Sequence, residues 1–192
     1  MIKGTSWKMK QNAIFCDIDG TFVEAFTRTS FIERKTIISI SYKPMSLDPL
    51  YWAITETSEN NSEPLSFRSW GAFTCPALPL DEVTFENDSS CVDQLLQKAQ
   101  KTVIEKSENF ISKLSETSFS NEIMNHNNQI ERGAYAISLV TSLIDEKDYE
   151  EAHSIAKRYA AGELECCHSH THVGKDFNEL AIEWLSGNGY VT

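Results

Sequence analysis

The 192-residue sequence is poor in the residues that build catalytic loops and disulfide scaffolds. It contains eight glycines, five prolines and five cysteines. The glycines form no phosphate-binding loop, and no serine stands in a nucleophile-elbow sequence. The odd number of cysteines, with Cys166 and Cys167 adjacent and poorly placed to bridge each other, favours reduced thiols and a cytoplasmic location.

Long hydrophobic runs are also missing. The longest apolar-leaning stretch, 134–144, is interrupted by Ser138, Thr141 and Ser142 and has about half the length that a membrane crossing needs. The apolar run before Asp17 has only four residues, 13–16, and is far shorter than the hydrophobic region of a signal peptide. We therefore expect no membrane partner.

Basic residues are scarce. Seventeen Lys and Arg stand against 28 Asp and Glu, which gives a net charge of -11 and a pI near 4.9. An acidic chain repels nucleic-acid phosphates, so direct DNA or RNA binding is not expected. The content of 41% hydrophobic and 23% charged residues is ordinary for a folded protein with a sizeable core.

The negative charge is concentrated between residues 44 and 97. This stretch has one base, Arg68, and a net charge of -8. Its nine acids are Asp48, Glu56, Glu59, Glu63, Asp81, Glu82, Glu86, Asp88 and Asp93. Such a field attracts a cationic partner at long range.

The first half of the chain is predicted to be β-structure, because β-branched and aromatic residues recur in short runs between turn residues. The candidate strands are 13–18 continuing through 21–27, then 36–42, 50–55 and 66–74. The prolines fall between or just after these runs, and the polar stretch 56–63 is predicted to be a surface hairpin loop.

The second half changes to helical periodicity. Apolar spacing predicts helices near 90–115, 119–144, 148–161 and 175–186, with a weak segment at 125–129. Strands followed by helices predict an α+β fold, with an N-terminal antiparallel sheet of about four strands and about four helices packed against it. We expect one domain over 1–192, β-rich in 1–88 and helical in 89–192.

Residues 13–22 contain Asp17-Ile18-Asp19-Gly20-Thr21 after an apolar run. This segment resembles the first motif of the haloacid dehalogenase phosphatases. The resemblance implies that Asp17 is the nucleophile, that Asp19 is the general acid and that Mg²⁺ is the cofactor. Ser39 or Ser41 with Lys43 could be forced into the roles of the later Ser or Thr and the Lys of that family, but they fall in what is predicted to be an adjacent strand. The closing acidic pair is missing as a strand-end motif. Asp19-Gly20 between two β-like runs is also a favoured hairpin turn, and we prefer that interpretation, with no cofactor.

A second candidate for chemistry is the group Cys166, Cys167, His168, His170 and His172. Imidazole and thiolate can bind a transition metal. However, the spacing matches neither paired CxxC nor HExxH motifs, so metal binding remains an alternative to a loop of partly exposed histidines.

Two further patterns have both a structural and a binding interpretation. The first pattern combines aromatic rings with a base and consists of Trp52 and the stretch 66–73, which contains Arg68 and Trp70. Such residues occur both as anchors of binding sites and in half-buried strands. The second pattern is the acidic run 145–151 at the start of a predicted helix. Carboxylates at this end of a helix interact favourably with its dipole, and they could also bind a partner.

This small acidic chain resembles the immunity proteins of contact-dependent inhibition and other polymorphic toxin systems. The stretch from Tyr42-Lys43-Pro44 through 47–52 to 66–73 contributes to that resemblance. The resemblance implies a stoichiometric inhibitor, without enzymatic activity, that binds a cognate toxin domain, a basic nuclease, and blocks its active site or substrate groove. We expect the partner surface to contain Asp48, Trp52, Glu56, Glu59, Glu63, Arg68, Trp70, Asp81, Glu82, Glu86 and Asp88.

Overall fold

The chain forms two compact units with interleaved sequences. The structure, a computed structural model, describes residues 6–30, 32–70, 73–86, 92–112, 117–125, 133–166 and 174–191. The sheet unit consists of Met1–Lys43 and Leu78–Glu116, and the helical unit consists of Pro44–Ala77 and Thr117–Thr192. The fold is α+β, as the sequence predicts, but the compact units do not divide at residue 88.

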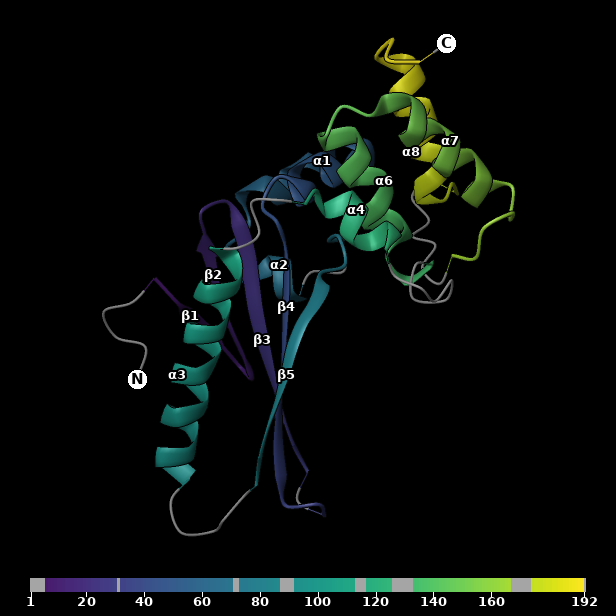
Figure 1. The fold of residues 1–192 in the computed structure, drawn as a ribbon. Coiled ribbons are helices and arrows are strands. Elements are labelled where there is room, and N and C mark those ends of the chain that lie inside the picture. The colour runs from purple at the N-terminus through teal and green to yellow at the C-terminus, as the bar shows by residue number, and fades with distance from the viewer. Residues whose placement is uncertain are drawn as a thin grey trace. The chain divides into compact units, whose positions relative to one another are not determined.

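The sheet unit contains a five-stranded sheet whose strands lie in chain order (Figure 1). Neighbours pair antiparallel where the register is defined, and β5 pairs with β4 although 33 residues of the helical unit separate them. The strands are β1 Lys8–Lys10, β2 Ala13–Ile18, β3 Thr21–Ser30, β4 Lys35–Pro44 and β5 Leu78–Glu86.

The turn between β2 and β3 confirms the hairpin predicted at Asp19-Gly20. Ile18 lies opposite Thr21, and φ is 49° at Asp19 and 81° at Gly20. Two consecutive positive φ angles define the tight turn whose twist matches that of the strands. The Gly20 N–H also donates to Oδ1 of Asp17 at 3.0 Å, which closes the turn.

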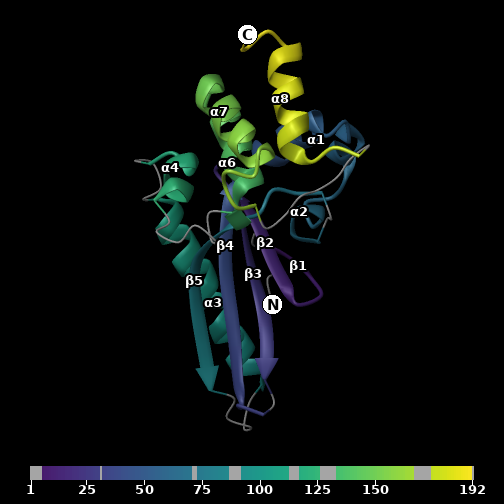
Figure 2. The same ribbon diagram turned by 90° about the vertical axis from the view of Figure 1, so that its right-hand side faces the viewer.

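One long helix, α3 Val92–Ile111, lies along one face of this sheet (Figures 1 and 2). Its Ala99 and Val103 side chains are buried. The Phe110 ring meets Tyr42 of β4 edge-on, with the ring centroids 4.8 Å apart. The predicted helix at 90–115 is thus confirmed, and its apolar face covers the sheet because a one-sided sheet must bury its own apolar face.

The helical unit contains seven helical segments in the described residues. They are α1 Leu47–Ile54, the 3-10 helix η1 Ser58–Ser62, α2 Phe67–Trp70, α4 Phe119–Met124, α6 Ala136–Asp145, α7 Tyr149–Ala160 and α8 Phe177–Gly187. α6 is buried on nearly every side and packs against α1, α4, α7 and α8. The rings of Tyr51 and Phe177, 5.2 Å apart, join α1 to α8.

Two predicted strands, 50–55 and 66–74, are wrong. The first is α1 and the second contains the short helix α2. In α1 the buried residues Leu47, Tyr51 and Ile54 recur at helical spacing. Pro49 occupies the first turn, where a missing backbone donor costs no intrahelical hydrogen bond.

The opposite error occurs at 78–86, where no strand is among the candidates and β5 is found. Pro79 lies near the start of an edge strand, opposite Ser41, and the register between β4 and β5 shifts between Ile40 and Ser41. An edge strand with a bulge accepts proline because the outward N–H is not needed. Most of the polar stretch 56–63 is exposed as expected, although Thr57 is buried, and the stretch contains η1 instead of forming a hairpin.

The remaining helix predictions are largely confirmed. Helices near 148–161 and 175–186 correspond to α7 and α8, and Gly162, with φ of 71°, follows the end of α7. Within the predicted helix 119–144, the described residues contain α4 and α6, and residues 126–132 lie outside the described residues. In the described part of the chain, no helix combines the length and apolar character that a membrane crossing needs.

Candidate functional site

The formal charge is divided very unequally between the two units. The helical unit has 16 acidic and 6 basic residues, a net charge of -10, whereas the sheet unit has 12 acidic and 11 basic residues, a net charge of -1. The acidic stretch 44–97 crosses the boundary between them, so its charges do not belong to one unit.

The predicted partner residues of the sheet unit are paired with bases of the same unit. Asp81 accepts a hydrogen bond from Lys106, and this bond, partly opposed by desolvation, lowers the pKa of the Asp81 carboxyl. Glu82 lies 4.0 Å from Arg28 and accepts from Ser39, and Glu86 lies 4.0 Å from Lys35. These acids therefore contribute little uncompensated charge. Asp88 lies outside the described residues.

Asp48, predicted as a surface acid, is fully buried in the helical unit, which corrects that prediction. Its Oδ2 accepts a hydrogen bond of 2.7 Å from Arg68, and its Oδ1 accepts from the backbone N–H of Cys75 at 2.8 Å. The Arg68 guanidinium also donates to the carbonyl of Met45. Asp48 thus fastens the segment around α2 to the first turn of α1.

Trp52 and Arg68 belong to the same buried network. Trp52 has 2% of its surface exposed, and the Arg68 guanidinium lies 5.3 Å from the centre of its ring. The indole N–H donates to the carbonyl of Phe73. Burial, with smaller contributions from Cys75 and Asp48, raises the pKa of the neighbouring Tyr51. These residues hold the unit together, so the prediction that Trp52 and Arg68 present a binding surface is corrected. The Trp70 side chain lies outside the described residues.

Glu56, Glu59 and Glu63 are the predicted partner residues that remain on the surface of the helical unit. All three side chains are exposed, around η1. Within the described residues none of them forms an ion pair. They are therefore free to act on a cationic molecule.

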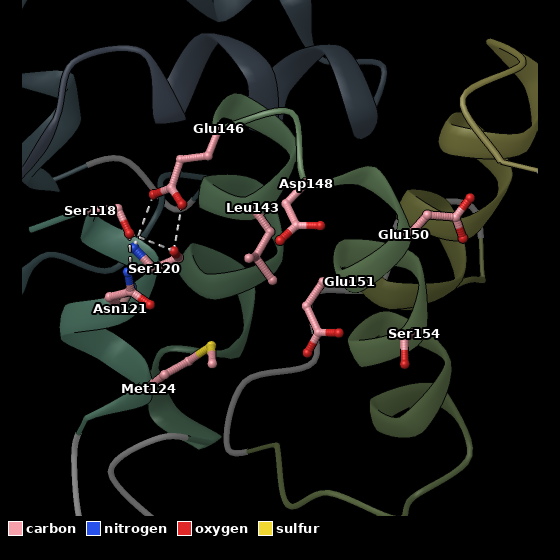
Figure 3. A pocket seen from close by; sticks show the side chains of 10 residues that line it. All are labelled: Ser118, Ser120, Asn121, Met124, Leu143, Glu146, Asp148, Glu150, Glu151 and Ser154. Carbon is pink, nitrogen blue, oxygen red and sulfur yellow. Dashed lines mark hydrogen bonds between the residues drawn. The ribbon is translucent and has the colours of Figure 1, made fainter.

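A second acidic surface lies in a hollow of about 560 Å³ between α4, the turn after α6 and the start of α7 (Figure 3). Its lining residues are Ser118, Ser120, Asn121, Met124, Leu143, Glu146, Asp148, Glu150, Glu151 and Ser154. Figure 3 shows Glu146 directed toward α4, whereas Asp148 and Glu151 lie on the α7 side.

The acids in this hollow have different roles. Glu146 accepts from the N–H and hydroxyl of Ser120, at 3.1 and 2.5 Å, and from the hydroxyl of Ser142 at 2.9 Å. Glu146 therefore anchors the start of α4, where its negative charge also interacts favourably with the helix dipole. Asp148 precedes α7, and Glu150 and Glu151 occupy its first turn, as the dipole interpretation of 145–151 predicts. These three have no ion pair among the described residues.

The 17–21 motif lies on an antiparallel hairpin, with Asp17 and Asp19 exposed. Ser41 donates to Glu24, Ser39 donates to Glu82, and Lys43 is buried against the Phe22 ring. The described strands do not form the parallel sheet that collects phosphatase residues at one edge. We therefore find no structural support for the phosphatase alternative.

The proposed metal ligands Cys167, His168, His170 and His172 lie outside the described residues, and only Cys166 of that group lies inside them. Elsewhere in the described ranges, no group of three or more His, Cys, Asp or Glu side chains is arranged to hold a metal ion. Metal binding by the 166–172 group stays an alternative to the preferred loop of partly exposed histidines.

Comparisons with models of protein families, with curated proteins and with solved structures found no match to this chain. The immunity-protein resemblance rests on the residues of the chain itself.

Proposed function

We propose that this protein is an immunity-type inhibitor that binds a basic toxin domain and blocks its active site or substrate groove. The observation that carries the proposal is the charge of -10 on the helical unit, set against -1 on the sheet unit. The helical unit is the binding part, and the sheet unit is the nearly neutral remainder of the fold.

The uncompensated acids of the helical unit have the chemistry that such a role requires. Glu56, Glu59 and Glu63 lie around η1, and Asp148 and Glu150 lie at the start of α7. Carboxylates mimic phosphate charge, so they attract an enzyme whose substrate groove is lined by Lys and Arg. Attraction between exposed charges acts mainly within about 8 Å at physiological ionic strength, and its effect is greatest on the rate of association.

Paired acids serve this purpose poorly. A carboxylate beside a lysine or arginine presents a dipole to an approaching protein instead of a net charge, and the field of a dipole falls off more steeply with distance. Asp81, Glu82 and Glu86 are in this position. For this reason we assign recognition to the unpaired acids of the helical unit.

The direct test is co-expression with the toxin domain encoded next to the gene for this protein. We expect the protein to restore growth of a host that produces the toxin domain, and the two chains to purify as one complex that weakens with added salt. Growth arrest that persists with the protein in excess would contradict the proposal.

A matched pair of variants tests which unit binds. Glu59→Lys with Glu150→Lys changes two exposed acids of the helical unit, and Glu33→Lys with Glu86→Lys makes the same charge change on the sheet unit. We expect the first pair to slow association by about tenfold or more at low salt and the second to have a much smaller effect. Equal effects would show that only the total charge matters.

A further inference from the structure

An aromatic stack lies on the surface of the helical unit where the start of α7 meets the end of α8. The rings of Tyr149 and Tyr190 are parallel to within 20°, with centroids 4.2 Å apart, and the Trp184 ring lies 5.6 Å from that of Tyr190. The stack is not buried: Tyr190 is 42% exposed, and Tyr149 and Trp184 are partly exposed.

Two exposed carboxylates adjoin Tyr149 in the sequence, at the start of α7. Asp148 and Glu150 are the sequence neighbours of Tyr149, and both side chains are exposed and form no ion pair among the described residues. Glu150 also lines the hollow of Figure 3, so the stack borders the acidic surface of α7. The start of α7 thus carries both the exposed carboxylates and Tyr149, the ring that joins this part of the helix to Tyr190.

The combination of aromatic rings and carboxylates favours binding of an arginine side chain over a lysine side chain. A guanidinium is planar, stacks on an aromatic face and can bind a carboxylate through two parallel hydrogen bonds. An ammonium group is more strongly hydrated and makes neither planar contact as well. Surface tyrosine and tryptophan are also the residues that most often carry the binding energy of an interface.

We propose that the Tyr149–Tyr190–Trp184 stack, with Asp148 and Glu150, is the docking site for an arginine of a basic protein partner. The arginine guanidinium lies on the exposed face of the stack and its charge is met by the two carboxylates. This inference rests on the proposed function, because the partner is the toxin domain. The site identifies the part of the acidic unit that gives specificity for the partner in addition to long-range attraction.

The test uses the full chain and two probes of equal length and charge, a peptide of alternating arginine and glycine and its lysine counterpart. Binding is followed by the NMR signal of the Trp184 indole N–H and by calorimetry. We expect the arginine peptide to shift that signal and to bind about threefold tighter than the lysine peptide. Equal affinity for the two peptides, or no binding of either, would overturn the site.

Two substitutions at Tyr190 separate stacking from simple bulk. Tyr190→Phe keeps an aromatic ring and should keep the preference for arginine, whereas Tyr190→Leu keeps apolar volume and should abolish it. If Tyr190→Leu retained the preference, the stack would not be the site. Glu150→Gln should weaken binding of both peptides, and Glu59→Gln, an equal loss of charge near η1, should not alter the preference.

The peptide experiment and the toxin experiment can fail separately. Selectivity for the arginine peptide without neutralisation of the toxin would support the docking site and contradict the proposed function. Neutralisation with no loss in Tyr190→Leu would keep the function and place the interface elsewhere on the protein.

Discussion

The carboxylate of Asp48 and the guanidinium of Arg68 form a 2.7 Å ion pair in which the Asp48 side chain is fully buried and the Arg68 side chain is 12% exposed. The partners are twenty residues apart in the sequence and connect α1 to the segment around α2. Removing one member of a buried pair leaves the other charge without compensation.

We predict that Asp48→Ala lowers the free energy of unfolding by about 3 to 5 kcal/mol. The loss is large because the substitution strands Arg68 and also removes the acceptor of the Cys75 N–H. Denaturation with urea, followed by circular dichroism, measures it. Glu163→Ala breaks an exposed pair with Arg158 at 3.8 Å and should cost less than about 1 kcal/mol. Similar costs for the two variants would refute the structural role of Asp48.

Glu146 provides a second test of a structural acid. Because it accepts three hydrogen bonds from Ser120 and Ser142, Glu146→Ala should destabilise the helical unit by about 1 to 3 kcal/mol. Glu165→Ala changes another exposed glutamate of that unit, whose carboxylate accepts no hydrogen bond among the described residues, and should be close to neutral. Amide hydrogen exchange of α4 localises the effect. Unchanged protection of α4 in Glu146→Ala would mean that this carboxylate does not anchor the helix.

Two glycines with open space around them separate backbone conformation from packing. A Cβ at Gly20 or at Gly187 would meet nothing within 4 Å, but φ is positive only at Gly20. Gly20→Ala should therefore cost about 1 to 2 kcal/mol. Gly187→Ala, at the end of α8, should be neutral or stabilise by up to about 1 kcal/mol. Equal shifts in the urea midpoint would contradict the hairpin geometry.

Local chemistry was sufficient to predict the hairpin and most helices. Asp19-Gly20 specifies its turn through two residues that tolerate positive φ, and the apolar spacing of α7 and α8 is regular. By contrast, 50–55 is rich in aromatic and β-branched residues, yet it belongs to α1. Its burial against α6 and α8 outweighs the intrinsic β-propensity.

β5 could have been predicted from its alternation. Val83 and Phe85 are less exposed than the alternating residues Glu82, Thr84 and Glu86, which is the period-two pattern of a strand. The prolines near its start argue against a central strand, whereas an edge strand tolerates proline. The sequence alone does not reveal that β5 lies at the edge.

The candidate site depended on information that the linear pattern does not contain. The acidic stretch 44–97 looks continuous, but its members belong to two units and many of them meet bases from distant segments, as Asp81 meets Lys106. Tyr149 and Tyr190 are 41 residues apart and meet only because α7 and α8 pack together. Net charge could be counted from the sequence, whereas its compensation required the fold.

The final prediction concerns pH and His153, a residue of α7 with 9% of its surface exposed. Burial lowers the pKa of this imidazole from its usual 6.5, the charge of Lys157 lowers it further, and Glu150 opposes the shift. Below pH 6.5 the unfolded chain binds a proton at this position that the folded chain binds less readily. Stability must therefore fall as the pH drops through and below 6.5.

We expect His153→Gln to remove this part of the pH dependence, because glutamine does not titrate. The measurement is the difference in free energy of unfolding between wild type and variant from pH 7.5 to 5. Asp81→Asn is the control: the Asp81 carboxyl has a pKa lowered from 3.8, so its stabilisation is present above that pH and is lost only on further acidification. The Asp81 variant should thus parallel wild type between pH 7.5 and 5. If the His153 variant did the same, burial would not be holding this imidazole neutral.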